Sequence, residues 1–133
     1  VTLRIPINSE RDMELSLIDL LPAGFEIENR RLGGLSTPPS AGSKEDADNP
    51  AGETSPPTFE EMRDDRYMAV YTLARGKLSA AVNKQGAVIA RYLMRAVTPG
   101  KYRLPAAYAE DMYRPEINAT TSESSVKVIR RKR

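Results

Sequence analysis

The 133-residue sequence contains no cysteine and no histidine. Without cysteine there is no disulfide, no thiolate nucleophile and no sulfur ligand for zinc, and without histidine the usual imidazole base is missing. These two absences exclude most hydrolytic mechanisms and the usual zinc sites. We therefore expect a chain that is not an enzyme and that has no catalytic residue, no cofactor and no bound metal. The lack of cysteine does not identify a compartment, because many exported proteins lack it too.

The sequence also lacks a strong excess of either charge and a long apolar run. Its net charge is +2 with 29% charged residues, so its balance does not by itself indicate nucleic acid. No apolar run approaches about 18 residues, and no signal-type segment is visible, so we expect no membrane insertion by this chain. Because it opens with Val1 rather than methionine, we interpret it as a piece of a much larger chain.

A basic segment closes the sequence, with Lys127 followed by four cations at 130–133. We interpret it as a solvated tail and expect no nucleic-acid partner. A nucleic-acid anchor is the weaker alternative, and it would show a steep fall of affinity with salt.

Residues 36–58 are rich in proline, serine, glycine and acidic residues and contain almost no large apolar side chain. Such a segment cannot offset its ordering entropy by burial. We therefore expect a mobile insertion loop at 36–58 within a single domain that spans residues 1–133.

The remaining sequence shows the alternation of apolar and polar residues that is typical of β-strands. The segments with this pattern, or with β-rich composition, are 1–8, 13–17, 25–28, 67–73, 88–97, 101–104 and 126–128. About seven short strands with turn residues between them predict an all-β fold, an antiparallel β-sandwich. The residues expected to point into it are Leu15, Leu17, Phe25, Tyr92, Met94 and Val128. The second face of the 88–97 strand, with Ile89, is expected to lie partly in solvent.

Helical structure is indicated only weakly. Thr58 and Glu61 have the spacing of a capping box, which would begin one or two helical turns over 59–64. Residues 77–85 are rich in alanine, but glycines flank them and their helical period is poor, so we expect a loop or irregular strand there. The neighbouring carboxylates of Asp64 and Asp65 lack the spacing of a calcium loop, and a solvated turn with arginine partners is the preferred interpretation.

Met112 and Tyr113 are two large side chains in a charged, turn-like run between Pro105 and Pro115. Composition alone favours packing at the edge of the core. The alanines at 106, 107 and 109 are too small to anchor a strand, however, and charged residues surround the pair. These features instead predict an exposed loop at one edge of the sandwich, where two large apolar side chains imply a partner surface.

Four phrases occur together in a characteristic order: LLPAGFEI at 20–27, RDDR at 63–66, YLMRAVTPG at 92–100 and AEDMY at 109–113. With their spacing, the sequence from Met13 to Val128 resembles the carboxy-terminal macroglobulin-like domain of bacterial alpha-2-macroglobulins. The resemblance implies a seven-stranded antiparallel sandwich, akin to fibronectin modules, at the end of a very large chain exported to the periplasm and in some members anchored to the inner membrane.

The resemblance also implies a function as part of a broad-spectrum endopeptidase inhibitor. In this family a protease cuts a bait segment, the chain rearranges, and a thioester in a separate domain captures the attacker. The positions that match the family's thioester-covering pair are Met112 and Tyr113, which makes the thioester domain of the same chain and target proteases the expected partners. The alternative is a generic β-sandwich module for adhesion or protein interaction.

Overall fold

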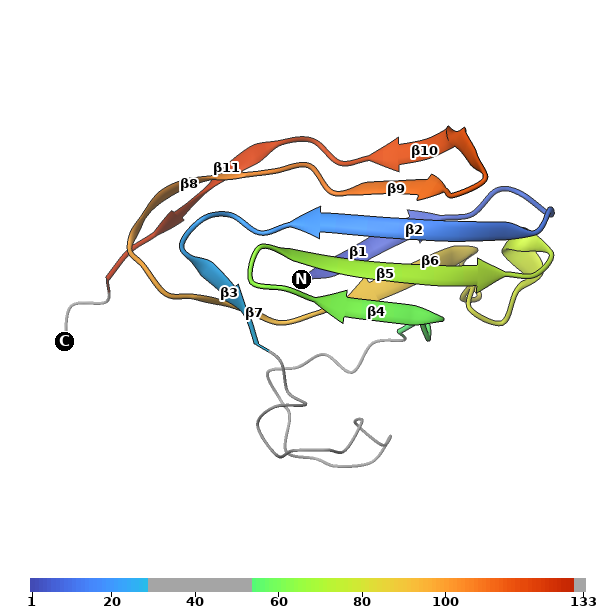
Figure 1. Cartoon of the computed structure of the whole chain (residues 1–133), viewed down its shortest axis with the longest axis horizontal. Helices are drawn as coiled ribbons and strands as arrows, with labels where there is room; N and C mark the ends of the chain where they lie inside the picture. Colours follow the sequence, from blue (N-terminus) through green and yellow to red (C-terminus); the bar gives the residue numbers. More distant parts are fainter. Residues whose placement is uncertain (29–53, 131–133) are drawn as a thin grey trace, which may run out of the picture.

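The computed structural model describes residues 1–28 and 54–130, whose regular structure is β-strand apart from one short 3-10 turn, η1 (Gly76–Leu78). All strand pairs are antiparallel and lie in two layers (Figure 1), so the predicted all-β sandwich is confirmed. The described strands are β1 (Thr2–Pro6), β2 (Met13–Leu20), β3 (Phe25–Ile27), β4 (Phe59–Met62), β5 (Arg66–Leu73), β6 (Ala87–Arg91), β7 (Met94–Ala96), β8 (Gly100–Leu104), β9 (Tyr108–Asp111), β10 (Arg114–Thr120) and β11 (Ser124–Val128).

The first layer is a five-stranded sheet in the order β10-β9-β2-β5-β4. β2 lies at its centre, and every second residue of β2 is buried, as the period-2 pattern requires. Leu17 pairs with Ala69 on one side and with Ala109 on the other. The long side chain therefore packs between two small ones.

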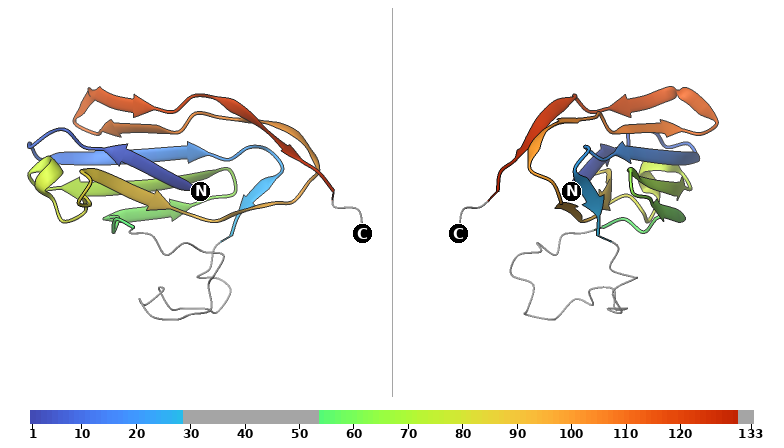
Figure 2. Two further views of the ribbon diagram at one scale, coloured as in Figure 1. Left: turned by 180° about the vertical axis from the view of Figure 1, so that it is seen from behind. Right: turned by 60° about the vertical axis from the view of Figure 1, so that its left-hand side comes forward.

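The second layer contains β1 paired with β6, and β7 paired with β3 (Figure 2, left). The prediction of one continuous strand over 88–97 is wrong, because the chain forms two strands, β6 and β7, with Tyr92 and Leu93 between them. The two halves pair with different strands. β1 pairs with the first half, β6, and β3 pairs with the second half, β7. Ile89 is also buried rather than partly solvated.

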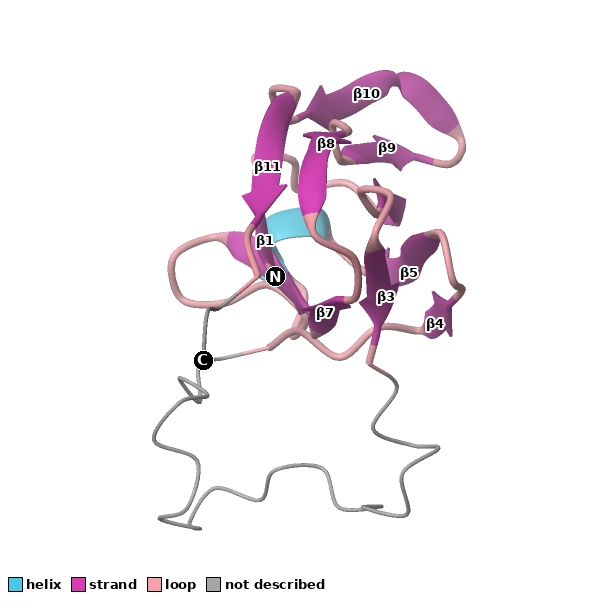
Figure 3. Cartoon of the chain, turned by 90° about the vertical axis from the view of Figure 1, so that its left-hand side faces the viewer, coloured by secondary structure: helices cyan, strands magenta, loops and turns pink. Residues whose placement is uncertain are grey.

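A two-stranded ribbon of β8 and β11 extends the fold beyond the five-stranded sheet (Figures 1 and 3). Tyr102 anchors it, because its ring lies edge-on to Phe25 with centroids 6.3 Å apart and packs directly over Gly24. A Cβ at Gly24 would lie 2.5 Å from that ring. Val128, predicted to enter the sandwich, is instead half-buried in the ribbon opposite Gly100 and outside the core cluster.

The core lies between the two layers. Leu15, Leu17 and Tyr92 are buried as predicted, while Phe25 and Met94 are partly buried and pack against the core cluster. Its buried members are Ile5, Ile7, Met13, Leu15, Leu17, Leu21, Tyr67, Ala69, Tyr71, Leu73, Val88, Ala90, Tyr92 and Ala109.

The helical turns expected over 59–64 are absent from the structure, and this prediction is wrong. β4 occupies Phe59–Met62 and pairs with β5. Thr58 does not cap a helix, because its hydroxyl accepts a hydrogen bond from the Thr72 backbone N–H at 3.0 Å. The following turn has the predicted character, with Asp64 and Asp65 exposed and Arg66 3.4 Å from an Asp65 carboxylate oxygen.

Most of the loop predicted at 36–58 lies outside the described residues, but its last part is fixed. Ser55 is buried, donates its backbone N–H to the Ile89 carbonyl at 2.9 Å and accepts the Ile89 N–H on its hydroxyl at 2.9 Å. Residues 54–58 therefore belong to the sandwich, where Ser55 is bonded to β6 just before the chain enters β4.

A buried polar cluster joins the layers. Asp19 accepts a 2.6 Å hydrogen bond from the Tyr92 hydroxyl, and the Tyr92 ring stacks on Tyr67 with centroids 4.6 Å apart. Burial raises the pKa of the Asp19 carboxyl above its ordinary value, and the hydrogen bond from Tyr92 offsets part of this shift.

This raised pKa predicts a pH dependence of stability. The folded state binds the Asp19 proton more tightly than the unfolded state, so this group stabilises the fold at low pH, and that contribution is lost as pH rises through the raised pKa. The free energy of unfolding of the parent minus that of Asp19→Asn should therefore fall as pH rises across this window. Urea denaturation of both chains at a series of pH values measures it. A difference that grows with pH would show that the charged form is the stabilised one.

Candidate functional site

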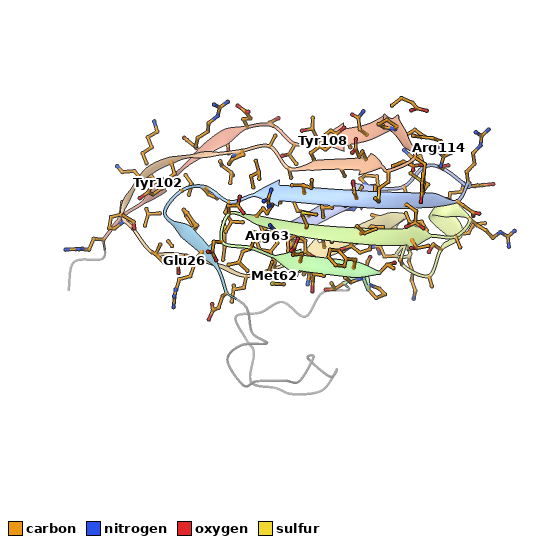
Figure 4. All side chains as sticks on the ribbon, in the orientation of Figure 1. Glu26, Met62, Arg63, Tyr102, Tyr108 and Arg114 are labelled. Carbon is orange, nitrogen blue, oxygen red and sulfur yellow. The ribbon has the colours of Figure 1, made fainter. Side chains whose placement is uncertain are left out.

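Met112 and Tyr113 form the turn of a β-hairpin at one end of the sandwich. Asp111 of β9 and Arg114 of β10 are paired, so only these two residues form the loop. The Met112 side chain is 54% exposed and that of Tyr113 is 81% exposed. The prediction of an exposed loop is thus confirmed, and core packing is excluded. Figure 4 shows Arg114 at this end and Tyr102 of the ribbon at the other.

The strands that carry the turn were missed by the sequence reasoning. Ala109, judged too small for a strand, lies in β9, is buried and pairs with Leu17 of β2. Its small size is what the site requires, because the leucine fills the space in front of it. Ala107 is likewise buried and exchanges hydrogen bonds with Thr121 across the hairpin.

A buried carboxylate holds the turn from within. Asp111 is 1% exposed, and one of its carboxylate oxygens accepts the Tyr113 backbone N–H at 3.1 Å. The other accepts a hydrogen bond from Nε of Arg114 at 2.8 Å and forms an ion pair with its Nη2 at 2.6 Å. The carboxylate therefore connects the two residues that lie on either side of Met112–Tyr113. We call Asp111 and Arg114 the clamp.

Two further hydrogen bonds tie the turn and Arg114 to the end of the β1–β2 loop and to the start of β2. Arg114 Nη2 donates to the Asp12 carbonyl at 2.7 Å, and the Met112 N–H donates to the Glu14 carbonyl at 2.8 Å. Asp12 in turn accepts the Arg75 N–H on its side chain at 2.7 Å. Three loops are thus joined at this end of the sandwich, as Figures 1 and 2 show.

Asp111 and Arg114, which form the clamp, are the residues of this turn that sequence reasoning did not single out. Their charges were recorded only as polar surroundings of the pair. In the sequence, the only indication of an ion pair was that the two charged residues flank two large apolar residues. The burial of Asp111 could be known only from the fold.

The chemistry of this end is that of a contact surface. A thioether and an aromatic ring present apolar area together with one hydroxyl. Among the described residues there is no group of three or more histidine, cysteine, aspartate or glutamate side chains placed to hold a metal ion.

A separate groove of about 640 Å³ opens between β1 and β10. Its lining is mainly aliphatic, with Ile5, Met13 and Ile117 among the contributors, and it includes no ionisable side chain. It therefore offers no acid–base pair. Within the part of the chain that the structure describes, no helix has the length and apolar character needed to cross a membrane.

Comparison with known proteins identifies the family. Residues 1–116 match the family model described as the bacterial alpha-2-macroglobulin MG10 domain. The chain belongs to this family. The MG10 match covers both layers of the sandwich and the Met112–Tyr113 turn, and it confirms the resemblance found in the sequence.

Individual relatives agree with this assignment. The MG10 domain is 37% identical to the alpha-2-macroglobulin of Xylella fastidiosa over 118 residues, which is 88% of this chain but 7% of that protein. A crystal structure of native Escherichia coli alpha-2-macroglobulin, spanning domain MG7 to the C-terminus, matches at 34% identity and a TM-score of 0.62, over 95% of this chain and 18% of that one. The trypsin-activated E. coli protein matches at 27% identity with the same TM-score, over 95% and 8%. The chain thus corresponds to one module within a much longer protein.

Proposed function

We propose that this MG10 domain is the carboxy-terminal, non-catalytic module of a protease trap, in which the Met112–Tyr113 turn covers a thioester carried by another domain. The observation that carries the proposal is the turn itself: two large side chains are exposed, yet their backbone is fixed by buried groups. Exposed apolar side chains held in one geometry are typical of a preformed contact surface.

The chemistry of a thioester explains why such a cover is useful. A thioester reacts with water and amines, so it survives only where both are kept away. The thioether of Met112 and the ring of Tyr113 can exclude water, and they bring no amine or thiol to attack the carbonyl.

The relatives support two parts of the proposal, action of a protease on the full-length protein and a carboxy-terminal position of this domain. The E. coli protein has been obtained in a native form and in a form activated by trypsin, which shows that a protease acts on that relative. The region matched in the native form lies within the segment from MG7 to the C-terminus, in agreement with a carboxy-terminal position.

We expect the parent protein to be exported to the periplasm, where it would meet foreign proteases. Cell fractionation tests this, and recovery in the cytoplasmic fraction alone would contradict it.

The proposed cover predicts the effect of truncating the turn. In the full-length protein, Met112→Ala together with Tyr113→Ala should shorten the lifetime of the thioester by about tenfold or more, because water gains access. Release of one thiol after methylamine treatment, followed over days of storage, measures the thioester that remains.

The matched control truncates two exposed apolar side chains away from the turn, Leu93→Ala with Ile129→Ala. This variant should keep the lifetime of the parent. An equal thioester lifetime in all three proteins would contradict the cover function and would favour a general interaction module.

A further inference from the structure

The Met112–Tyr113 turn has an unusual sequence for its geometry. Two-residue hairpin loops favour turns with positive φ, which is why Asn-Gly and Gly-containing pairs dominate them. Here neither loop residue has positive φ; among described non-glycine residues only Arg75 does. Local backbone preference therefore does not explain why the hairpin turns at this point.

The pairing of β9 with β10 is irregular next to this turn. Immediately after the Asp111–Arg114 pair the register shifts, and regular pairing resumes only at Asn118. Turns with negative φ tend to splay the strands that follow, and an irregularity of this kind accommodates the splay. The hairpin keeps Met112 and Tyr113 at its tip even though a two-residue turn with glycine at positive φ would pair the strands better.

The clamp supplies the restraint that the turn sequence lacks. The buried Asp111 carboxylate contacts the Tyr113 N–H and two nitrogens of Arg114, which belong to the turn and its flank. Charge-assisted hydrogen bonds to a buried group are stronger and more directional than those of neutral pairs. Arg114 also donates a hydrogen bond to the Asp12 carbonyl, which ties the turn to the neighbouring loop.

We propose that Asp111 and Arg114 are positioning residues that hold the Met112–Tyr113 turn in its covering geometry before the partner domain is met. This inference rests on the proposed role of the turn as a thioester cover. The clamp does not touch the thioester; it fixes the backbone from which the two covering side chains project. Because the turn is already ordered, less conformational entropy is lost when the cover closes.

The test uses the full-length protein and two measurements. Asp111→Asn keeps the shape and the acceptor for the Tyr113 N–H but removes the charge that holds Arg114. It should raise amide hydrogen exchange in the peptide that contains the turn by about tenfold, and it should shorten the thioester lifetime by a similar factor. Arg114→Lys keeps the charge but loses the two-nitrogen contact, and an intermediate change is expected.

The control is another ion pair, which lies on the neighbouring loops and touches neither residue of the clamp. Lys77 Nζ lies 2.8 Å from a Glu10 carboxylate oxygen on the surface, so Glu10→Gln should change neither measurement. Exchange in peptides from β2 and β5 should stay at the parent value in every variant, which shows that the sandwich is intact.

The outcomes separate this inference from the cover function. Unchanged exchange in the turn of both Asp111→Asn and Arg114→Lys would overturn the positioning role. Faster exchange with an unchanged thioester lifetime would overturn it as well, provided that the Met112→Ala and Tyr113→Ala double variant shortens that lifetime. If the double variant has no effect either, the cover function fails, and the exchange result alone decides whether the clamp orders the turn.

Discussion

Replacing Gly76 by alanine should destabilise the 133-residue chain by about 3 kcal/mol or more. Gly76 has φ of +53°, and a Cβ there would lie 2.0 Å from the Ser9 carbonyl oxygen and 2.8 Å from that of Arg11. These are backbone atoms, so no side-chain rotation relieves the contact. The β1–β2 loop would have to move, which would break the 2.7 Å hydrogen bond from the Lys77 N–H to Ser9.

Gly86 provides the matched control, because its φ is +72° and a Cβ there meets nothing within 4 Å. Gly86→Ala should cost only the strain of the backbone conformation, about 1 kcal/mol. Urea denaturation of the two variants measures the difference directly. Equal losses would show that strain alone, and not the packing of Gly76 on the β1–β2 loop, sets the cost.

The second large effect is expected in the centre of the five-stranded sheet. Leu17→Ala should cost about 2 to 5 kcal/mol, because Leu17 is 2% exposed and its cross-strand partners are both alanines. Side chains as small as Ala69 and Ala109 cannot fill the space that the leucine leaves. We therefore expect a value in the upper half of that range.

Leu20 lies on the same strand but is 41% exposed, so Leu20→Ala has the same chemistry without the cavity. Its loss should stay below about 1 kcal/mol. Equilibrium urea unfolding compares the two substitutions. A Leu17→Ala loss no larger than that of Leu20→Ala would mean that the surrounding strands collapse into the vacated space.

The sequence allowed the sandwich to be predicted because alternation is a local property. β2 shows this clearly, since its inward residues could be assigned without knowledge of any partner. The hairpin of β9 and β10 could not be predicted in the same way. Ala109 has no apolar bulk of its own, and its place in a strand depends on Leu17, more than ninety residues earlier in the chain.

The helix predicted after Thr58 was wrong for the opposite reason, because a local sequence pattern was outweighed by pairing with another strand. Spacing to Glu61 suggested a helix start, but the Thr58 hydroxyl and backbone N–H bond to β5, the strand that follows β4. Cross-strand pairing fixed the segment as β4, since a strand at the edge of an existing sheet gains a complete ladder of hydrogen bonds that one isolated helical turn lacks.

The candidate site could likewise be predicted from the sequence only in part. Exposure of Met112 and Tyr113 could be predicted from the charges around them, and their importance from the family resemblance. The clamp could not, because Asp111 and Arg114 are ordinary surface residue types until the pairing of β9 with β2 buries the carboxylate.

The pairing of β1 with β6 has a kinetic consequence. Thr2 pairs with Arg91, and Ile18 of β2 pairs with Tyr108, so β1 and one edge of β2 pair with residues about ninety positions later in the chain. Loop closure over such distances slows folding, and domains of this kind fold in milliseconds to seconds rather than microseconds. During synthesis β1 and β2 leave the ribosome with unpaired edges and exposed apolar faces. The hairpin that carries the Met112–Tyr113 turn is local by comparison, but its place beside β2 requires closure of the loop of about ninety residues between Ile18 and Tyr108.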